Sequence, residues 1–288
     1  MATAPIDLDS LGTDVEWPDH ESATSAREAA DLSLGRVADI AEWLSGVQGA
    51  FPPRPPARVR VVVFGASPDS TVDELAAELG CGVRPVGDGI PAAADEALSA
   101  GAAIADEEID SGTDLFVAAD PDRSIASAVA VCVLTDTEPA KVLARGAAAT
   151  DPDLWMDRAA AVRDMRRRTI GFRRQPDRLL AALERPMLAA AAGFVLRSAA
   201  RRTPVVLDGS AITAAALLAY EAQPRAVRWW WAADTSSDPA HTLALTTMGL
   251  RPVLDLGLGR HDGTAGLLAL PVLRTAGRLV QEDAGNAT

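Results

Sequence analysis

The chain has 288 residues, 48% of them hydrophobic and 23% charged, which is the composition of a globular protein and excludes an intrinsically disordered one. Its length suits one large α/β domain, or such a domain with a helical appendage. The formal net charge of −13 argues against nucleic acid or an anionic membrane surface as a general partner, because like charges repel.

Cysteine content, the N-terminus and hydropathy together indicate a cytoplasmic protein. The two cysteines, Cys81 and Cys132, form no CxxC pair, so we expect two buried, reduced thiols. The N-terminus is acidic and lacks the apolar core of a signal peptide. No uninterrupted apolar stretch reaches membrane length. Lys141 is the only lysine, and this preference for arginine is typical of GC-rich bacterial genomes.

The N-terminal part of the chain is expected to lie outside the main sheet. Residues 1–25 are acidic and contain prolines, a pattern that predicts an extended or frayed arm. Residues 26–47 carry apolar side chains at helical spacing and predict an amphipathic helix, followed by a proline-rich linker. We therefore divide the chain into an arm (1–25), a helical subdomain with its linker (26–58) and an α/β domain (59–288), whose last helix packs against the helical subdomain.

Two short apolar runs in the middle of the chain, residues 60–64 and 114–119, predict buried parallel strands. The segments between and after them are alanine-rich or show helical periodicity. The elements expected there are a helix over residues 92–111, a helix over 124–134, a short strand over 141–144 and helices over 153–168 and 176–200.

The C-terminal part repeats one pattern three times: a short apolar strand, a polar loop and a helix. The predicted strands cover residues 203–207, 227–233 and 252–256. This alternation predicts an α/β fold, with a mostly parallel sheet of about five or six strands and helices on both faces. Ligands bind such sheets outside the carboxyl ends of the strands, so we expect the polar loops to share one rim.

Three motifs carry a resemblance to a known family: RRTPVVLDG at 201–209, SSDPAH at 236–241 and LDLGLGRHDGTAG at 254–266. In their order and spacing, the chain resembles the nicotinate-nucleotide:dimethylbenzimidazole phosphoribosyltransferases of cobalamin assembly. The resemblance implies a Rossmann-like three-layer fold, a dimer with itself or with a homologue, and no cofactor. It also implies small-molecule substrates, because the family moves phosphoribosyl from nicotinate mononucleotide to a benzimidazole-type base and releases nicotinate.

The resemblance places an acidic residue at the family's catalytic position. The family's general base is the Glu of a Gly-Glu-Gly-Thr-Gly-Ala motif, and Asp262 matches it within the stretch HDGTAG at 261–266. Aspartate keeps the acid–base chemistry but reaches about 1.5 Å less far. His261 replaces a glycine and is a second candidate base near neutral pH. The alternative is structural: His261 and Asp262 cap the last helix.

The family's glycine-rich phosphate loop is replaced here by the sequence ADPDRSI at residues 119–125. Phosphate needs open backbone N–H groups at a helix N-terminus, but Pro121 removes a donor and two aspartates add negative charge. Two alternatives remain: Arg123 pairs directly with the phosphate, or the aspartates cap the helix that begins at Ser124. The residues matched to substrate-binding positions are Asp120, Arg123, Ser124, Asp208, Gly209, Ser236, Ser237, His241, Leu258, Gly259, Gly263 and Thr264.

Other polar and aromatic clusters have structural explanations. The consecutive carboxylates at 106–108 point about 100° apart on a helix, so we expect a solvated helix face and no metal site. The arginines between 158 and 178 are expected to pair with carboxylates at a helix end. The three tryptophans at 229–231 alternate faces of a strand and predict core or dimer packing. His241 is expected to orient its loop by hydrogen bonding rather than to ionise.

Two functions remain open at this point. The first is a phosphoribosyltransferase with altered base specificity, and the preserved C-terminal motifs argue for a retained fold and assembly. The lost phosphate-loop glycines favour a catalytically silent paralogue that binds a partner, as does the shortening of the family's benzimidazole-pocket segment to residues 71–91. Fold alone does not decide between an enzyme and a binding partner.

Overall fold

The computed structural model describes residues 7–65, 67, 69–122, 124–144 and 151–286. At its centre is a five-stranded sheet in the order β2-β1-β3-β4-β5, in which all paired strands are parallel. The strands are β1 Val59–Phe64, β2 Gly82–Val86, β3 Leu115–Ala119, β4 Val205–Asp208 and β5 Trp230–Ala232. The predicted α/β class is therefore confirmed, and the strand order reverses between β1 and β3.

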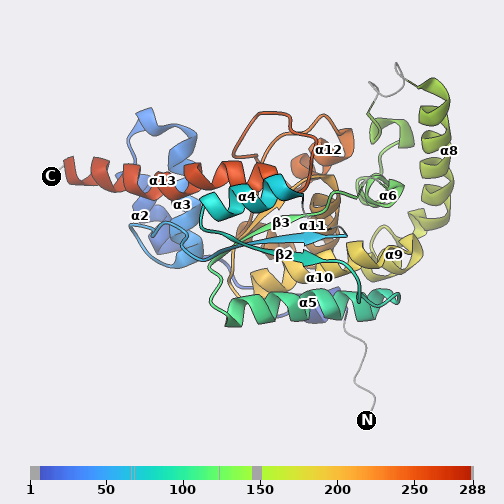
Figure 1. The fold of residues 1–288 in the computed structure, drawn as a ribbon, viewed down its shortest axis with the longest axis horizontal. Helices are drawn as coiled ribbons and strands as arrows, with labels where there is room; N and C mark the ends of the chain where they lie inside the picture. The colour runs from blue at the N-terminus through green and yellow to red at the C-terminus, as the bar shows by residue number, and fades with distance from the viewer. Residues whose placement is uncertain (1–6, 66, 68, 123, 145–150, 287–288) are drawn as a thin grey trace, which may run out of the picture.

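Helices cover both faces of the sheet (Figure 1). α3, α4 and α13 pack on one face, and α5, α6, α10 and α11 pack on the other. The α-helices are α1 Leu8–Gly12, α2 His20–Ala29, α3 Arg36–Gln48, α4 Ser70–Glu78, α5 Ala94–Asp110, α6 Ile125–Leu134, α8 Pro152–Thr169, α9 Pro176–Leu183, α10 Pro186–Ala200, α11 Ser210–Ala222, α12 Pro239–Met248 and α13 Thr264–Asn286. Short 3₁₀ helices span Leu32–Leu34, Pro139–Lys141, Ile170–Phe172 and Pro224–Trp229.

Side chains of the central strands alternate between two apolar cores. In β1, Val61 packs with α3, α4 and α13, while Val62 packs with the helices of the opposite face. Below the sheet in Figure 1, α5 and α10 lie side by side. They approach so closely that a Cβ on Gly101 would overlap the carbonyl oxygen of Ala190. Burial on both faces explains why β1 and β3 are almost continuously apolar.

The N-terminal segment forms α1 and the start of α2, joined by a stretch without regular structure over 13–19, so the prediction of an extended arm was wrong where these helices form. Leu8 of α1 is fully buried, and its N–H donates to Asp177 Oδ1 at 2.9 Å. The single helix predicted over 26–47 is instead α2 and α3, because Asp31 caps an intervening 3₁₀ turn and Gly35 has a positive φ of 50°. Both helices pack on α13. The division of the chain into two domains stays a prediction.

Proline and a left-handed residue interrupt the helix that was predicted over 176–200. Glu184 has a positive φ of 51°, and Pro186 then opens α10 as a separate helix after α9. The short strand predicted over 141–144 is not formed. The described chain there leaves a 3₁₀ turn and continues without regular structure.

The edge strands differ most from the sequence-based expectation. The strand predicted over 227–233 is shortened to β5, which follows the 3₁₀ helix Pro224–Trp229. The strand predicted over 252–256 is reduced to one parallel bridge between Pro252 and Ala232. By contrast, β2 is an edge strand that the structure contains but the apolar pattern did not predict.

The tryptophans at 229–231 pack within the protein, in agreement with the prediction of core packing. Trp229 and Trp230 are buried, and their indole N–H groups donate to backbone carbonyl oxygens at 2.8 Å and 3.2 Å. Trp231 points to the other face, where its ring centroid lies 5.2 Å from that of Trp43 in α3, in an edge-to-face arrangement. Both cores therefore receive indole side chains from one short strand.

The consecutive carboxylates of α5 form ion pairs. Glu108 is buried rather than solvated, because its oxygens lie 2.7 Å from Arg60 Nε and 2.8 Å from Arg84 Nη1. Asp106 pairs with Arg197 at 2.9 Å. Within the described ranges, no group of three or more His, Cys, Asp or Glu side chains is placed to hold a metal ion.

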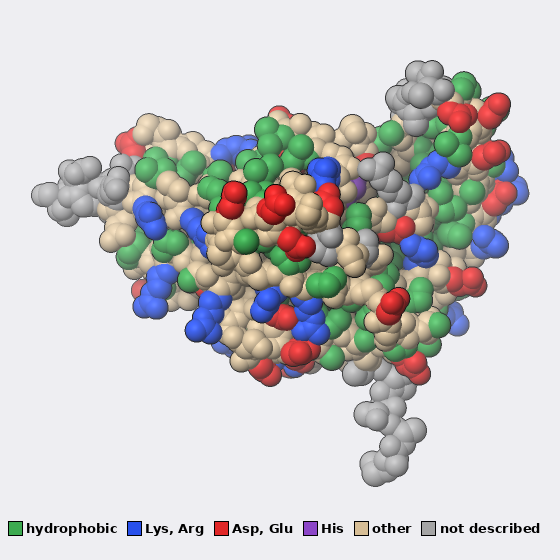
Figure 2. Space-filling model, in the orientation of Figure 1, with side chains coloured by type: hydrophobic (Ala, Val, Ile, Leu, Met, Phe, Trp, Pro, Cys, Tyr) green, Lys and Arg blue, Asp and Glu red, His purple; other side chains and the backbone are tan. Residues whose placement is uncertain are grey.

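Arginines of the basic run pair with a carboxylate on the surface. Arg166 and Arg173 from the basic run both pair with Asp136, as expected for arginines at a helix end. On the face shown in Figure 2, acidic and basic side chains are interspersed. This distribution does not resemble a nucleic-acid interface, which concentrates basic side chains. Over the residues that the structure describes, no helix is both long enough and apolar enough to cross a membrane.

Candidate active site at the carboxyl ends of the strands

Polar loops meet where the parallel strands end. Asp120 directly follows β3, and Asp208 is the last residue of the neighbouring strand β4. Asp234 follows β5, and its two carboxylate oxygens accept hydrogen bonds from Leu256 N at 2.7 Å and Leu258 N at 2.8 Å. The loop after β5 and the loop before α13 are thereby joined. The structure thus contains the common rim that the strand–loop–helix pattern predicted.

Asp208 holds the start of α13 against the end of β4. Its side chain is buried, and Oδ2 accepts a hydrogen bond from Gly266 N at 3.1 Å. Burial raises the pKa of Asp208 to about 7, and the nearby charge of Asp262 adds to the rise, while backbone N–H groups of the α13 N-terminus oppose it. Burial therefore favours the protonated form of this carboxyl group.

Asp120 begins a capping turn where the family has a phosphate loop. Its Oδ1 accepts from Asp122 N at 2.8 Å, and Asp122 accepts from Ser124 N at 3.0 Å and Ser124 Oγ at 2.6 Å. Ser124 in turn caps α6. Burial raises the pKa of Asp120 to about 7. These hydrogen bonds match the capping alternative, whereas Arg123 lies outside the described residues.

A hydrogen-bonded cluster connects the loops after β4 and β5. Ser210 Oγ donates to Asp238 Oδ2 at 2.5 Å, and Asp238 N donates to Ser236 Oγ at 3.1 Å. Ser236 Oγ lies 3.4 Å from His261 Nε2. Ser237 is exposed in the same loop. The cluster brings two of the matched positions, Ser236 and His261, together from segments that are distant in sequence.

His241 lies in the first turn of α12, whose N-cap is Asp238. Its side chain is buried, and burial lowers its pKa to about 4, so the ring is neutral near pH 7. Neither ring nitrogen has a hydrogen-bond partner among the described residues, so the loop-orienting hydrogen bond expected for His241 is not seen. Its ring centroid lies 6.4 Å from that of His261. His241 is therefore a buried, neutral side chain beside His261 in the loop before α13.

The carboxylate at the matched catalytic position is held on both oxygens. Asp262 Oδ1 accepts from Thr264 N at 3.1 Å, and Oδ2 lies 2.9 Å from Arg260 Nε. The other end of the Arg260 guanidinium pairs with Asp69, which caps α4. The side chain of Asp262 is 14% exposed, so solvent reaches it. The first contact is the one expected for helix capping, and the second places a cation beside the candidate base.

Two of the matched glycines are required by the local geometry. Gly209 and Gly263 have positive φ values of 97° and 103°. A Cβ on Gly209 would overlap the side chain of His261, and a Cβ on Gly263 would lie 2.9 Å from Val61 Cγ1. Gly259, by contrast, has open space at the Cβ position. Gly209 and Gly263 therefore allow the loop before α13 to approach the sheet.

Sequence reasoning assigned no role to Arg260 or Asp69. Asp69 could have been identified as a helix cap, because an Asp before a helical segment is the usual residue there. Its pairing with Arg260 spans 191 residues of sequence and has no local signal. The pairing ties the loop after β1 to the loop that carries Asp262. Asp208 and Asp234 tie the ends of β4 and β5 to the same segment before and at the start of α13.

Comparisons with known proteins show what this chain is similar to. A family model described as phosphoribosyltransferase matches residues 91–287. The nicotinate-nucleotide–dimethylbenzimidazole phosphoribosyltransferase of Mycobacterium avium (strain 104) is 37% identical over 323 aligned positions, covering 91% of this chain and 92% of that protein. The protein of the same name from Streptomyces avermitilis is 35% identical over 340 positions, covering 96% of this chain and 91% of that protein.

Solved structures give the same result at the level of the fold. CobT from Thermus thermophilus superposes with a TM-score of 0.79 at 26% identity, covering 92% of this chain and 98% of that chain. The alignments with the two curated relatives are longer than the 288 residues of this chain, so gaps fall in this chain. This agrees with the expectation of a shortened protein. None of these relatives is described as a partner without activity, so the comparisons do not favour the silent-paralogue alternative.

Proposed function

The chain belongs to the nicotinate-nucleotide–dimethylbenzimidazole phosphoribosyltransferase family, and we propose that it transfers phosphoribosyl from nicotinate mononucleotide to a benzimidazole-type base for the lower ligand of cobalamin. In this reaction the bond between the ribose carbon and the nicotinate nitrogen breaks. A bond from the same carbon to a ring nitrogen of the acceptor forms, and the acceptor loses its N–H proton. Nicotinate leaves, and the reaction balances without an oxidant or a cofactor.

The observation that carries this proposal is the position of Asp262 at the shared rim. The rim lies at the carboxyl ends of parallel strands, where ligands bind in sheets of this kind. Asp262 is partly accessible there, and contacts from Thr264 N and Arg260 Nε fix its orientation. A carboxylate held in this way can take the proton of the acceptor base. His261, which lies next to Asp262 in sequence, remains the second candidate base.

The proposed substrate-binding set follows the matched positions around the rim. It comprises Asp120, Arg123, Ser124, Asp208, Gly209, Ser236, Ser237, His241, Leu258, Gly259, Gly263 and Thr264. The N–H groups of Thr264 and Gly266 already donate to carboxylates, so the start of α13 is not an open phosphate site. We therefore expect nicotinate mononucleotide to bind more weakly here than at an intact glycine-rich loop.

We also propose that the protein is cytoplasmic and dimeric, with itself or with a homologue. Leu32, at the tip of the connection between α2 and α3, is 99% exposed and Trp17 is 59% exposed, which supports a contact surface near these helices. The tryptophans at 229–231 give less support than expected from the sequence, because they pack within the chain. Sedimentation analysis that finds a monomer at micromolar concentration, with no co-purifying homologue, would contradict a dimer.

The direct test of the proposed function is product formation. The purified protein is incubated with nicotinate mononucleotide and 5,6-dimethylbenzimidazole, and both nicotinate and the phosphoribosylated base are separated and quantified. We expect the two products in equal amounts, with benzimidazole and other substituted benzimidazoles compared as acceptors. If neither product forms with any benzimidazole, the proposed reaction is wrong.

A further inference from the structure

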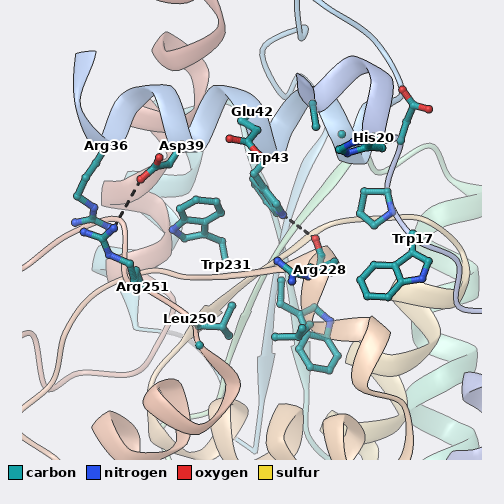
Figure 3. Close-up of a pocket in the computed structure, with 17 residues that line it drawn as sticks. Trp17, His20, Arg36, Asp39, Glu42, Trp43, Arg228, Trp231, Leu250 and Arg251 are labelled. Carbon is teal, nitrogen blue, oxygen red and sulfur yellow. Dashed lines mark hydrogen bonds and ion pairs between the residues drawn. The ribbon is translucent and has the colours of Figure 1, made fainter. Parts of the chain in front are cut away.

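A separate cavity lies beside the edge strand β5, away from the carboxyl rim. It encloses about 610 Å³ between α2 and α3 on one side and residues 227–231 and 249–251 on the other (Figure 3). None of the residues proposed for phosphoribosyl transfer lines it. A cavity of this size is within the range of small-molecule sites. Its occupant must therefore be sought independently of the transferase reaction.

The cavity has aromatic walls. Trp43 and Trp231 line it with their rings in edge-to-face contact, and Trp43 Nε1 is fixed by donating to Arg228 O at 3.0 Å (Figure 3). Trp17 adds a partly exposed ring near the opposite end. Among the described residues, the buried indole N–H of Trp231 has no hydrogen-bond partner. These walls offer aromatic surface to a flat, apolar ring.

The acidic side chains around the cavity are already engaged. Asp39 lies 3.8 Å from Arg251, and Glu42 accepts a hydrogen bond from Arg27 Nε at 2.8 Å. Asp19 caps α2 by accepting a backbone N–H at 2.8 Å. These contacts leave little carboxylate capacity for binding a cationic ligand.

Two arginines that line the cavity have no carboxylate partner among the described residues. Arg228 lies over the ring of Trp17 at 5.9 Å, and Arg36 donates to the carbonyl oxygen of Pro252. Neither guanidinium pairs with a carboxylate in the part of the chain that the structure describes. A guanidinium presents parallel N–H groups that match the two oxygens of a carboxylate. The charge balance therefore favours an anionic ligand.

We propose that this cavity binds a planar aromatic carboxylate, with its ring against Trp43 and Trp231 and its carboxylate on Arg228. Aromatic contact supplies apolar burial, and the guanidinium supplies a charge-assisted hydrogen bond that a neutral ring does not make. The proposal does not depend on the transferase reaction, because the two sites share no residue.

The test uses indole-3-carboxylate and its neutral analogue indole-3-carboxamide, with binding measured by calorimetry and by protein tryptophan fluorescence. We expect the carboxylate to bind saturably and at least tenfold more tightly than the amide. Saturating nicotinate mononucleotide should leave this affinity unchanged. Equal affinity for the two probes, or displacement of the carboxylate by nicotinate mononucleotide, would overturn the proposal.

The matched variants are Arg228→Gln and Arg225→Gln. Both arginines lie over the ring of Trp17, at 5.9 Å and 6.0 Å, but only Arg228 lines the cavity. We expect Arg228→Gln to weaken carboxylate binding about tenfold or more and Arg225→Gln to leave it unchanged. Equal effects of the two changes would overturn the assignment. The assignment is also overturned if the wild type binds neither probe and Arg228→Gln changes the oligomeric mass. This face of the protein would then contact a second copy of the chain.

Discussion

His261 is packed directly against Gly209. Gly209 has a φ of 97°, and a Cβ at this position would overlap the Cβ and ring atoms of His261. Because Asp262 follows His261, this contact sets the distance between the end of β4 and the loop that carries the candidate base. The packing at Gly209 thus connects a backbone requirement to the position of the proposed catalytic group.

Substituting Gly209 by alanine should displace this loop. The added methyl group meets His261, and the positive φ strains a non-glycine residue, so we expect a loss of about 1–3 kcal/mol in the free energy of unfolding. Transfer activity should fall further than this loss of stability accounts for. Gly80→Ala is the control, since Gly80 also has a positive φ of 66° but has no atom near its Cβ position. Retained activity in Gly209→Ala would show that the loop position is not set here.

The raised pKa of Asp208 predicts a pH-dependent loss of stability. A buried carboxyl group with a pKa of about 7, against an ordinary value of 3.8, keeps its proton more tightly in the folded chain. Its contribution is fully present below about pH 4 and is lost as the pH rises to about 7. Asp208→Asn stays neutral, so its stability relative to wild type should increase from pH 5 to pH 8 in urea unfolding. If the difference in unfolding free energy between Asp208→Asn and wild type is the same at pH 5 and pH 8, Asp208 does not titrate in this range.

The lowered pKa of His241 predicts the opposite dependence of stability on pH. Its pKa is lowered by burial from 6.5 to about 4, so the folded chain favours the neutral ring. The corresponding stability is present above about pH 6.5 and is lost as the pH falls to about 4. His241→Phe should therefore resist unfolding better than wild type near pH 4.5, relative to their difference at pH 7.5. Nuclear magnetic resonance of the wild-type ring checks the cause: titration near pH 6.5 would contradict burial of a neutral histidine.

The sheet could be predicted where its signals are local. β1 and β3 are short runs of apolar residues because both of their faces are buried, and such runs are visible in the sequence. β2 lies at the edge of the sheet and contains Arg84 and Pro85, so it lacks this pattern. α1 has only five residues and is stabilised by the burial of Leu8, which no periodicity indicates.

The strand–loop–helix pattern predicts which polar residues follow the strand ends, but not the contacts that these residues make. This pattern placed Asp208 and Asp234 at one rim, because parallel strands end on the same side. It gave no information on the burial that raises the pKa of Asp120, nor on the ion pair between Arg260 and Asp69. Both depend on packing between segments that are distant in sequence.

We expect the carboxylate of Asp122 in the native protein to lower the affinity for nicotinate mononucleotide. Its carboxylate stands at the matched phosphate loop and pairs with Arg185 at 2.8 Å. Asp122→Gly removes a negative charge, opens the backbone and releases Arg185 for the phosphate. We expect the dissociation constant to fall about two- to fivefold, because a partly exposed charge pair is worth up to about 1 kcal/mol. Unchanged affinity in calorimetric titration would place the phosphate elsewhere, for example at the arginines of α8.

The final prediction concerns Asp262 as the general base. Asp262→Asn removes the base but retains an oxygen for the N–H of Thr264, so the fold should be preserved. Turnover should fall by about 10² to 10⁴, the usual contribution of general-base assistance. Asp262→Glu restores the reach of the family's side chain and should retain or raise turnover. Nicotinate release by all three proteins, with several benzimidazoles as acceptor, measures both effects.

Arg260 and His261 supply the controls for this assignment. Arg260→Gln removes the cation 2.9 Å from Asp262 but leaves the carboxylate in place, so turnover should fall less than in Asp262→Asn. His261→Asn removes the second candidate base. If Asp262→Asn keeps full turnover while His261→Asn loses it, the base is His261, because its imidazole is then the group that takes the acceptor proton. A loss in both variants, with stability unchanged, would instead mean that His261 positions Asp262 through its contact with Gly209.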